Sequence, residues 1–382
     1  MVLLGPLLVV VFTVSQSVRD VYFGSVFQRL DFFLVILLAF SWSTVIFAAT
    51  TLIRAPSDFA RLRAQFGPVV ATNVTTAVAW TSFFFALTYV DPAICNTIHS
   101  AMGPLTVVVL GARGVTLAKP GAIGRIEYAG YAGIAVSVAG LWWVVLGGYS
   151  GLALTNLAAS MAGLALLSVS GISIAISLLY CKRLQDCGIG ADAVTAARYL
   201  LLILFAGTVV FWHGNFGGVD TPRQFTLLSA ATTVFIVLPL YAYQLGIGRT
   251  TPLTAQVIRA LGPVFVFAME QFDGRLHYSL PTLACILVYS ASIIVSNIAH
   301  GWADESRYST IRRKRSSGSG CGAAILSRSC PLWVKSRHRR TSNQCLLYPQ
   351  KRTLVQRVGM SALCQADAVQ TLHPLHRLRE IV

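Results

Sequence analysis

Long apolar runs, separated by short polar segments, make up most of the first 299 residues of the chain. Each run is close to the roughly 20 residues that an α-helix needs to cross the hydrocarbon core of a bilayer. Because an unpaired backbone polar group is costly in lipid, runs of this length predict membrane-spanning helices. The pattern therefore predicts an all-α membrane protein with ten transmembrane helices, over residues 2–22, 32–53, 68–89, 92–111, 128–147, 156–180, 193–212, 225–246, 252–271 and 279–299.

Composition indicates the same class. Hydrophobic residues are 55 % of the 382 residues and charged residues only 12 %, half of the roughly 25 % typical of soluble domains. The net charge of +16 lies mostly beyond residue 298, where 15 of the 30 Lys and Arg residues occur. This basic segment, residues 302–382, is expected to be a disordered cytoplasmic tail. Its charge is no evidence for a nucleic-acid partner, and none is expected; the partner that the composition implies is the lipid bilayer.

The distribution of Lys and Arg between loops predicts the orientation of the chain. Connecting loops are short, so successive spans are expected to run antiparallel. One set of alternate loops holds nine Lys and Arg residues and the other holds three. Cytoplasmic loops are enriched in these residues, so the richer set is expected to be cytoplasmic. With ten spans both termini then lie in the cytoplasm, and the plasma (inner) membrane is the expected location of this multi-pass protein.

One sequence pattern occurs twice. Residues 85–109 read FALTYVDPAICNTIHSAMGPLTVVV, and residues 243–267 read YQLGIGRTTPLTAQVIRALGPVFVF. The Gly-Pro pairs of the two copies are 159 residues apart, an interval that holds five spans. Five is odd, so the second copy is expected to cross the membrane in the opposite direction, as in the inverted repeats of secondary transporters. The expected units are residues 1–150 and 151–301, each with five helices, followed by the tail.

These motifs resemble those of a known family. Ten spans in two five-helix repeats, with ALTYVDPA…GPL between the third and fourth spans, look like the EamA-like branch of the drug/metabolite transporter superfamily. The stretch ADAVTAARYLLLILFAG (191–207) also resembles the start of the seventh span of that family. The resemblance covers about residues 1–299 and implies a plasma-membrane exporter or importer of small metabolites.

Two ionisable residues are expected near the middle of the membrane. Arg259 lies eight residues after the cytoplasmic start of its span, and His99 lies eight residues after the outer start of its own, so each is about 12 Å deep. A charge at the bilayer centre costs at least about 2.5–3.5 kcal/mol and normally faces a cavity or a partner. Arg259 is therefore a candidate to bind the anionic group of a substrate, and His99 a candidate hydrogen-bond donor or proton carrier. Alternatively, Arg259 pairs with carbonyls or a hidden acid, and His99 is a core residue.

Further polar residues share these helix faces. Asn96 and Gln256 lie one turn before His99 and Arg259 respectively, and are expected to bind substrate as well. Glu270 is expected near the outer mouth, as a gate or proton-coupling site. The remaining candidates are Trp80 and Tyr243 for stacking on a substrate, Arg19 and Asp20 for gating or proton coupling, and Gly103, Pro104, Gly262 and Pro263 as hinges.

Motif content disfavours an enzyme. The spans hold no HExxH, no carboxylates at catalytic spacing and no Gly-rich phosphate loop, so no catalytic residue, metal or cofactor is expected. The favoured function is a secondary active transporter, an exporter or exchanger, of small anionic or amino-acid-like metabolites; an integral-membrane enzyme and a channel-like or structural protein are the alternatives. Ala129, Gly133 and Ser137 follow one another at four-residue spacing, a small-residue face that predicts tight helix packing or a homodimer contact.

Overall fold

The computed structural model describes residues 3–26, 30–115, 124–152, 156–213, 219, 221–247, 250, 252–274 and 276–317, with backbone only for 213, 244, 245, 247, 252, 253, 256 and 300–317. These parts of the chain are helical and contain no strand. Within them, nine helices are long and apolar enough to cross a membrane. The all-α membrane class expected from the hydropathy pattern is therefore confirmed.

Five spanning helices make up the first half of the described chain. Two of them begin at a capping aspartate: the Asp31 carboxylate accepts from the Phe33 amide, and the Asp91 carboxylate from the Ala93 amide. A short helix that hydropathy did not predict, α3 (Ser57–Ala64), lies between the second and third spans. The five spans are α1 (Leu4–Val26), α2 (Phe32–Arg54), α4 (Phe66–Tyr89), α5 (Pro92–Ala112) and α6 (Arg125–Leu146).

Interrupted helices distinguish the second half. The continuous spans are α7 (Leu157–Asp186) and α14, which begins at Leu280. Between them lie three segments with a break or a distortion: α8 (Ala191–Ala197) with α9 (Leu200–His213); α10 (Pro222–Thr232), the π-helical turn η2 (Thr233–Val237) and α11 (Leu238–Ile247); and α12 (Pro252–Ala260) with α13 (Gly262–Glu270).

The expected span over 252–271 is not one helix. It consists of α12 and α13, each of nine residues, and neither is long enough to cross a bilayer. Pro263 has no amide proton, and its ring clashes with the carbonyl four residues earlier, so the regular helix stops before it. The corresponding Pro104 lies inside α5 without ending that helix, so the Gly-Pro pair alone does not dictate a break.

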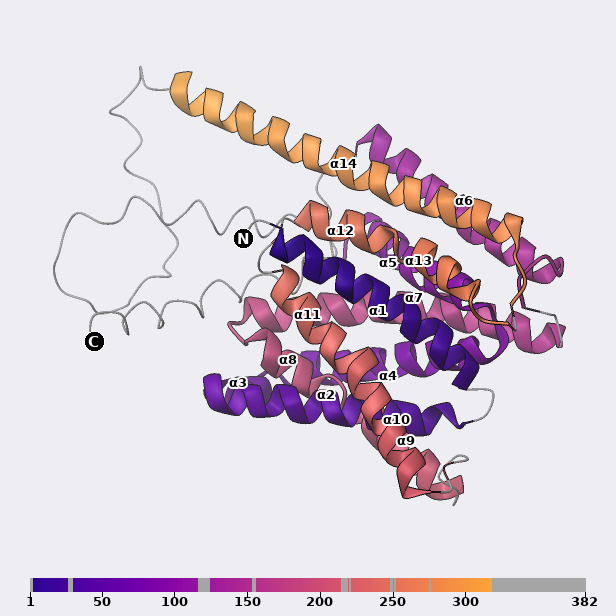
Figure 1. Cartoon of the computed structure of the whole chain (residues 1–382). Helices are drawn as coiled ribbons and strands as arrows, with labels where there is room; N and C mark the ends of the chain where they lie inside the picture. Colours follow the sequence, from indigo (N-terminus) through magenta and orange to yellow (C-terminus); the bar gives the residue numbers. More distant parts are fainter. Residues whose placement is uncertain are drawn as a thin grey trace.

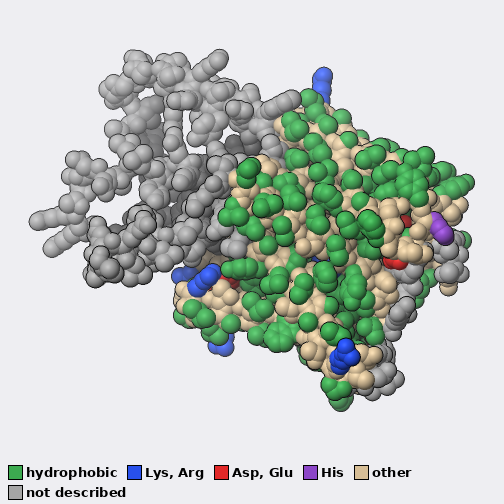
Figure 2. Space-filling model, in the orientation of Figure 1, with side chains coloured by type: hydrophobic (Ala, Val, Ile, Leu, Met, Phe, Trp, Pro, Cys, Tyr) green, Lys and Arg blue, Asp and Glu red, His purple; other side chains and the backbone are tan. Residues whose placement is uncertain are grey.

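The helices pack side by side in one bundle (Figure 1). Helix α1 lies along α11, α12 and α13, while α7 lies along α4 and α5. Helices α6 and α14 pair along one edge, and α2 packs on α8 and α9. Large aromatic side chains, including Phe23, Phe40 and Phe84, fill the centre. The visible outer surface is largely apolar (Figure 2), as expected for helices in contact with lipid.

Glycines allow α6 and α14 to approach closely. A Cβ atom on Gly130 would lie 2.9 Å from the Ser292 carbonyl oxygen, and one on Gly140 would lie 2.8 Å from the Cys285 sulfur. The Ser137 hydroxyl donates to the Cys285 carbonyl at 2.7 Å. The small-residue face that contains Gly133 and Ser137 therefore packs within the chain, whereas Ala129 is exposed. Its interpretation as a dimer surface is wrong, because α14 already occupies it.

Helix α14 (Leu280–Ser317) continues past the expected start of the tail at residue 302. Helix propagation adds one hydrogen bond per residue to a nucleus that already exists, so a polar, basic sequence can extend an apolar span. The expectation of disorder from residue 302 onward is therefore wrong as far as Ser317. The rest of the tail, residues 318–382, lies outside the described residues.

Asn73 on α4 satisfies the backbone at the break between α8 and α9. Its side-chain Nδ2 donates to the Ala197 carbonyl at 2.8 Å, and its Oδ1 accepts from the Leu201 amide at 3.0 Å. We expect Asn73→Leu to lower the free energy of unfolding by about 1 kcal/mol, as is usual for a polar contact between membrane helices. Chemical unfolding in detergent measures this change. Thr75→Val, whose hydroxyl bonds only within α4, is the control, and an equal loss there would contradict the role of Asn73.

Candidate functional site

The break between α12 and α13 leaves carbonyls at the end of α12 without partners in their own helix. The Ser290 hydroxyl of α14 donates to one of them, the Ala260 carbonyl, at 2.9 Å. The Ser17 hydroxyl of α1 donates to the Thr13 carbonyl at 2.9 Å and lies 3.3 Å from the Gly262 carbonyl. An interruption at membrane depth is tolerated where a neighbouring helix supplies such a partner, so Ser290 stabilises the break.

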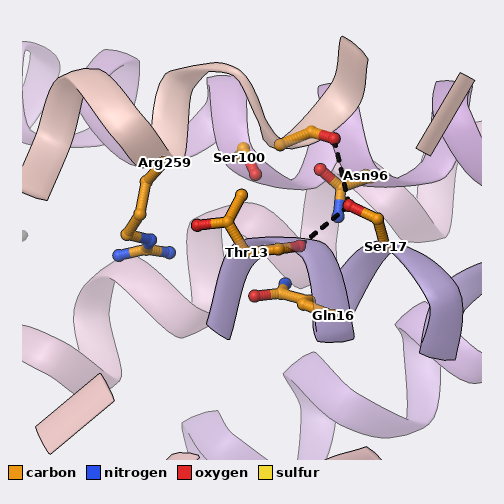
Figure 3. A pocket seen from close by; sticks show the side chains of 7 residues that line it. Thr13, Gln16, Ser17, Asn96, Ser100 and Arg259 are labelled. Carbon is orange, nitrogen blue, oxygen red and sulfur yellow. Dashed lines mark hydrogen bonds between the residues drawn. The ribbon is translucent and has the colours of Figure 1, made fainter. Parts of the chain in front are cut away.

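A polar cavity adjoins this break (Figure 3). Its volume is about 20 Å³, which in this conformation is room for about one water molecule. Arg259 lies toward one end, and Asn96 and Ser17 toward the other. Helix α1 supplies one wall, α5 another and the α12–α13 break the third; the lining residues are Thr13, Gln16, Ser17, Asn96, Ser100, Arg259 and Gly262.

Arg259 is held by an aromatic residue behind it. Its Nη1 donates to the Tyr243 hydroxyl at 3.2 Å, and its guanidinium carbon lies 5.3 Å from the centre of the Tyr243 ring. Tyr243 is itself stacked on Phe12, with ring centres 4.4 Å apart. Tyr243 was expected to stack on a substrate, but it does not line the cavity. Its contacts are those of a residue that positions the guanidinium through a cation–π interaction.

A buried ion pair lies behind Asn96. Arg19 donates to the Asp20 carboxylate from Nε at 2.8 Å and from Nη2 at 2.6 Å, and Asp20 is 0 % exposed. Asn96 donates from Nδ2 to the other Asp20 oxygen at 2.7 Å. Arg19 also lies over the ring of Trp80, 5.5 Å from its centre. Asn96 thus connects the cavity to the ion pair, and Trp80 contacts Arg19 rather than the cavity.

His99 points away from the cavity. Its Nδ1 lies 2.9 Å from the Ser170 hydroxyl of α7, and that hydroxyl donates to the Ala79 carbonyl at 2.6 Å. Because its own proton is used on Ala79, the Ser170 oxygen can accept a hydrogen bond from the ring nitrogen. The His99 ring also packs on Phe83, with ring centres 4.9 Å apart. Of the two expected midplane residues, Arg259 lines the cavity and His99 does not.

Glu270 lies in a separate polar cluster at the end of α13. It shares a donor with Asp91, the Ala93 amide, which reaches one Asp91 oxygen at 3.1 Å. Its Oε1 accepts from the Ala93 amide at 2.6 Å, and the other Asp91 oxygen accepts from the Gly151 amide at 3.2 Å. These bonds join α5, α13 and the connection between the two halves.

The expected hinge residues have two different environments. Gly262 and Pro263 begin α13 immediately after the break. Gly103 and Pro104 lie within continuous α5, and a Cβ on Gly103 would touch nothing within 4 Å. The side chain of Gln256 lies outside the described residues.

The sequence analysis did not single out the α1 residues of the cavity, Thr13, Gln16 and Ser17. Their spacing of three and four residues places them on one helix face, which is the signal that was available. Ser100, four residues after Asn96, was missed in the same way. Hydroxyl residues are common in spans and bond to their own helix, as Thr13 does to the Val9 carbonyl at 2.9 Å. Spacing therefore gives them little weight until a neighbouring helix is known.

Comparison with known proteins gives distant likenesses among solved structures, with 14 matching chains. No protein-family model and no curated protein matches the chain. A solved structure described only as "Crystal structure of protein" is similar at 17 % sequence identity and a TM-score of 0.49, over 78 % of this chain and 95 % of that one. In the described parts of the chain, no group of three or more His, Cys, Asp or Glu side chains is arranged to hold a metal ion.

Proposed function

We propose that the chain is a secondary active transporter of small organic metabolites that works by alternating access. The observation that carries this proposal is the polar cavity at the break between α12 and α13. Discontinuous helices that open beside a polar site near the middle of the membrane are typical of secondary transporters. An apolar bundle without such a site would have favoured a structural role.

We also propose that ten spans form two inverted halves of the EamA-like drug/metabolite type, and helix packing supports this arrangement. In that arrangement each helix of one half has a counterpart five spans later. Helix α7 packs on α4 and α5, and its counterpart α1 packs on α11 and on α12–α13, the counterparts of α4 and α5. Three further pairs join counterparts directly: α6 with α14, α2 with α8–α9, and α5 with α13.

The positions of the chain ends support an even number of crossings. The start of α1 and the end of α14 lie at the same end of the bundle (Figure 1). Together with the excess of Lys and Arg in one set of loops, this favours both termini in the cytoplasm. We propose the plasma membrane as the location, on the resemblance of the motifs alone.

Polar contacts at the two ends of the bundle are the proposed gates. At one end, Glu270, Asp91 and the Gly151 amide join α13, α5 and the connection between the halves. At the other, Arg61 donates to the Gly188 carbonyl at 2.7 Å, and Asp58 accepts from the Gly190 amide at 2.8 Å. Access to the cavity from one side requires one of these sets to separate. Glu270 is therefore a proposed outer gate.

Flux measurements in liposomes test the transporter. Purified protein is reconstituted with a panel of labelled organic acids, amino acids and polyols of three to five carbons. We expect saturable uptake of at least one compound, accelerated several-fold by the same unlabelled compound inside the vesicle. Flux that does not saturate would indicate a channel, product formation without flux would indicate an enzyme, and either result would refute the proposal.

A further inference from the structure

We infer that the cavity selects a small hydroxylated organic oxyanion, a hydroxy acid or a polyol phosphate, and not an amino acid. The inference rests on the proposed function and narrows its substrate class. Arg259 would bind the oxyanion, and the oxygen atoms of Thr13, Ser17 and Asn96 would accept from substrate hydroxyl groups. The argument combines the hydrogen-bond roles of the lining atoms with the charges around them.

Lining oxygens at the Asn96 end of the cavity are acceptors. Thr13 uses its single hydroxyl proton on the Val9 carbonyl at 2.9 Å. Ser17 uses its own on the Thr13 carbonyl at 2.9 Å, with the Gly262 carbonyl at 3.3 Å as a second acceptor. Asn96 donates from Nδ2 to Asp20, and its Oδ1 faces Gly262, 3.7 Å from the position of a Cβ there. Since a hydroxyl oxygen keeps two lone pairs after donating, these groups suit a ligand that brings O–H donors.

Charge around the cavity is positive on balance. Among the described residues that line the cavity, Arg259 is charged and none is acidic. The Asp20 carboxylate lies behind Asn96 and accepts three hydrogen bonds, two from Arg19 and one from Asn96. An oxyanion is attracted by the guanidinium of Arg259.

An amino acid would meet this field with an ammonium group. Neutral oxygens can accept its hydrogen bonds, but the described lining residues offer no carboxylate to balance its charge, and the guanidinium of Arg259 repels it. Burial raises the cost, because Thr13, Ser17 and Asn96 are each at most 5 % exposed and Coulomb energies grow as the surroundings become less polar. The site therefore distinguishes the two substrate classes that the sequence alone left open.

A matched set of three-carbon probes tests the inference. D-glycerate and glycerol 3-phosphate carry an oxyanion and hydroxyls. Propionate lacks the hydroxyls, glycerol lacks the charge, and D-serine replaces the C2 hydroxyl of D-glycerate by an ammonium with the same configuration. Binding to the full-length protein in detergent is measured by calorimetry. We expect glycerate or glycerol 3-phosphate to bind at least about 10-fold more tightly than the other three, since a hydrogen bond to a charged group contributes that much. The stronger of the two identifies carboxylate or phosphate as the preferred group.

Two variants assign the roles of the residues. Arg259→Gln is expected to weaken binding of the preferred anion by about 10- to 150-fold. Ser17→Ala is expected to weaken binding of the preferred anion by about 2- to 10-fold. It should leave the affinity for propionate unchanged, because propionate has no hydroxyl group that could donate to Ser17. Ser43→Ala is the matched control: Ser43 is a buried serine of α2 that donates to its own helix, at Ala39, and lies outside the cavity.

Several results would overturn the inference. They are serine binding within about threefold of glycerate, no binding of either hydroxylated anion to the wild-type protein, or equal weakening of glycerate and propionate by Ser17→Ala. The transporter proposal fails separately. Anion binding without saturable flux would support the inference and refute transport. Saturable serine flux that Arg259→Gln does not change would support transport and refute the inference.

Discussion

Asp20→Leu is expected to destabilise the protein by about 3–5 kcal/mol, because it leaves the Arg19 guanidinium buried without its carboxylate. The Arg19 side chain is 7 % exposed and that of Asp20 is 0 % exposed, so water cannot replace the lost partner. Loss of the Asn96 hydrogen bond to Asp20 adds to the effect. Chemical unfolding in detergent, followed by tryptophan fluorescence, measures the change.

Removal of both charges provides the control for this result. In Arg19→Met combined with Asp20→Leu, no uncompensated charge remains, and replacing a buried ion pair by apolar residues is often close to neutral. We expect the double variant to recover most of the stability that Asp20→Leu loses. A double variant as unstable as the single one would contradict this explanation, because the loss would then come from the missing ion pair and not from an unpaired Arg19 charge.

Gly130→Val is expected to have the next largest effect, at or above the upper end of the about 1–3 kcal/mol usual for overpacking. Even the Cβ atom of the new side chain would lie 2.7 Å from the Ser296 Cβ and 2.9 Å from the Ser292 carbonyl oxygen. A backbone atom cannot rotate away as a side chain can, so α6 and α14 must separate. The thermal midpoint in detergent should fall accordingly.

Gly207→Val is the matched control for Gly130→Val. Its added Cβ would make only an ordinary contact, 3.6 Å from the end of the Leu37 side chain. We expect this variant to lose much less stability than Gly130→Val. A loss in the control as large as that of Gly130→Val would contradict close α6–α14 packing as the cause.

Hydropathy located the spans well but could not detect their interruptions. The second span, expected over 32–53, is observed at Phe32–Arg54, and the fourth, expected over 92–111, at Pro92–Ala112. Averaged over 252–271, hydropathy still predicts one span, although α12 (PLTAQVIRA) is more polar than α13 (GPVFVFAME); only the Gly262-Pro263 pair, expected as a hinge, marked this position. The two Gly-Pro pairs look alike in the sequence, yet only the second is associated with a break. There, the Ser290 hydroxyl of α14 satisfies the carbonyl of Ala260, a contact that hydropathy does not report.

Depth in the membrane could be predicted for the site, but side-chain direction could not. Counting residues along a span fixes the height of a side chain, and Arg259 and Asn96 were found in this way. The same count selected His99, whose side chain turns toward Ser170 of α7 instead. Direction depends on which neighbour packs on each face of α5, and this becomes known only once the bundle is assembled.

The length of helix α14 makes its end a sensitive reporter of movement of the last span. Its spanning part ends at Ala299, and the same helix continues for 18 residues to Ser317, a rod of about 27 Å at 1.5 Å per residue. A fluorophore or spin label at the tip would magnify any change in the inclination of the last span: a rotation of about 10° displaces it by about 5 Å over this length. Distances from that tip to a second label on α3 would thus report movement between the halves without a probe inside the membrane.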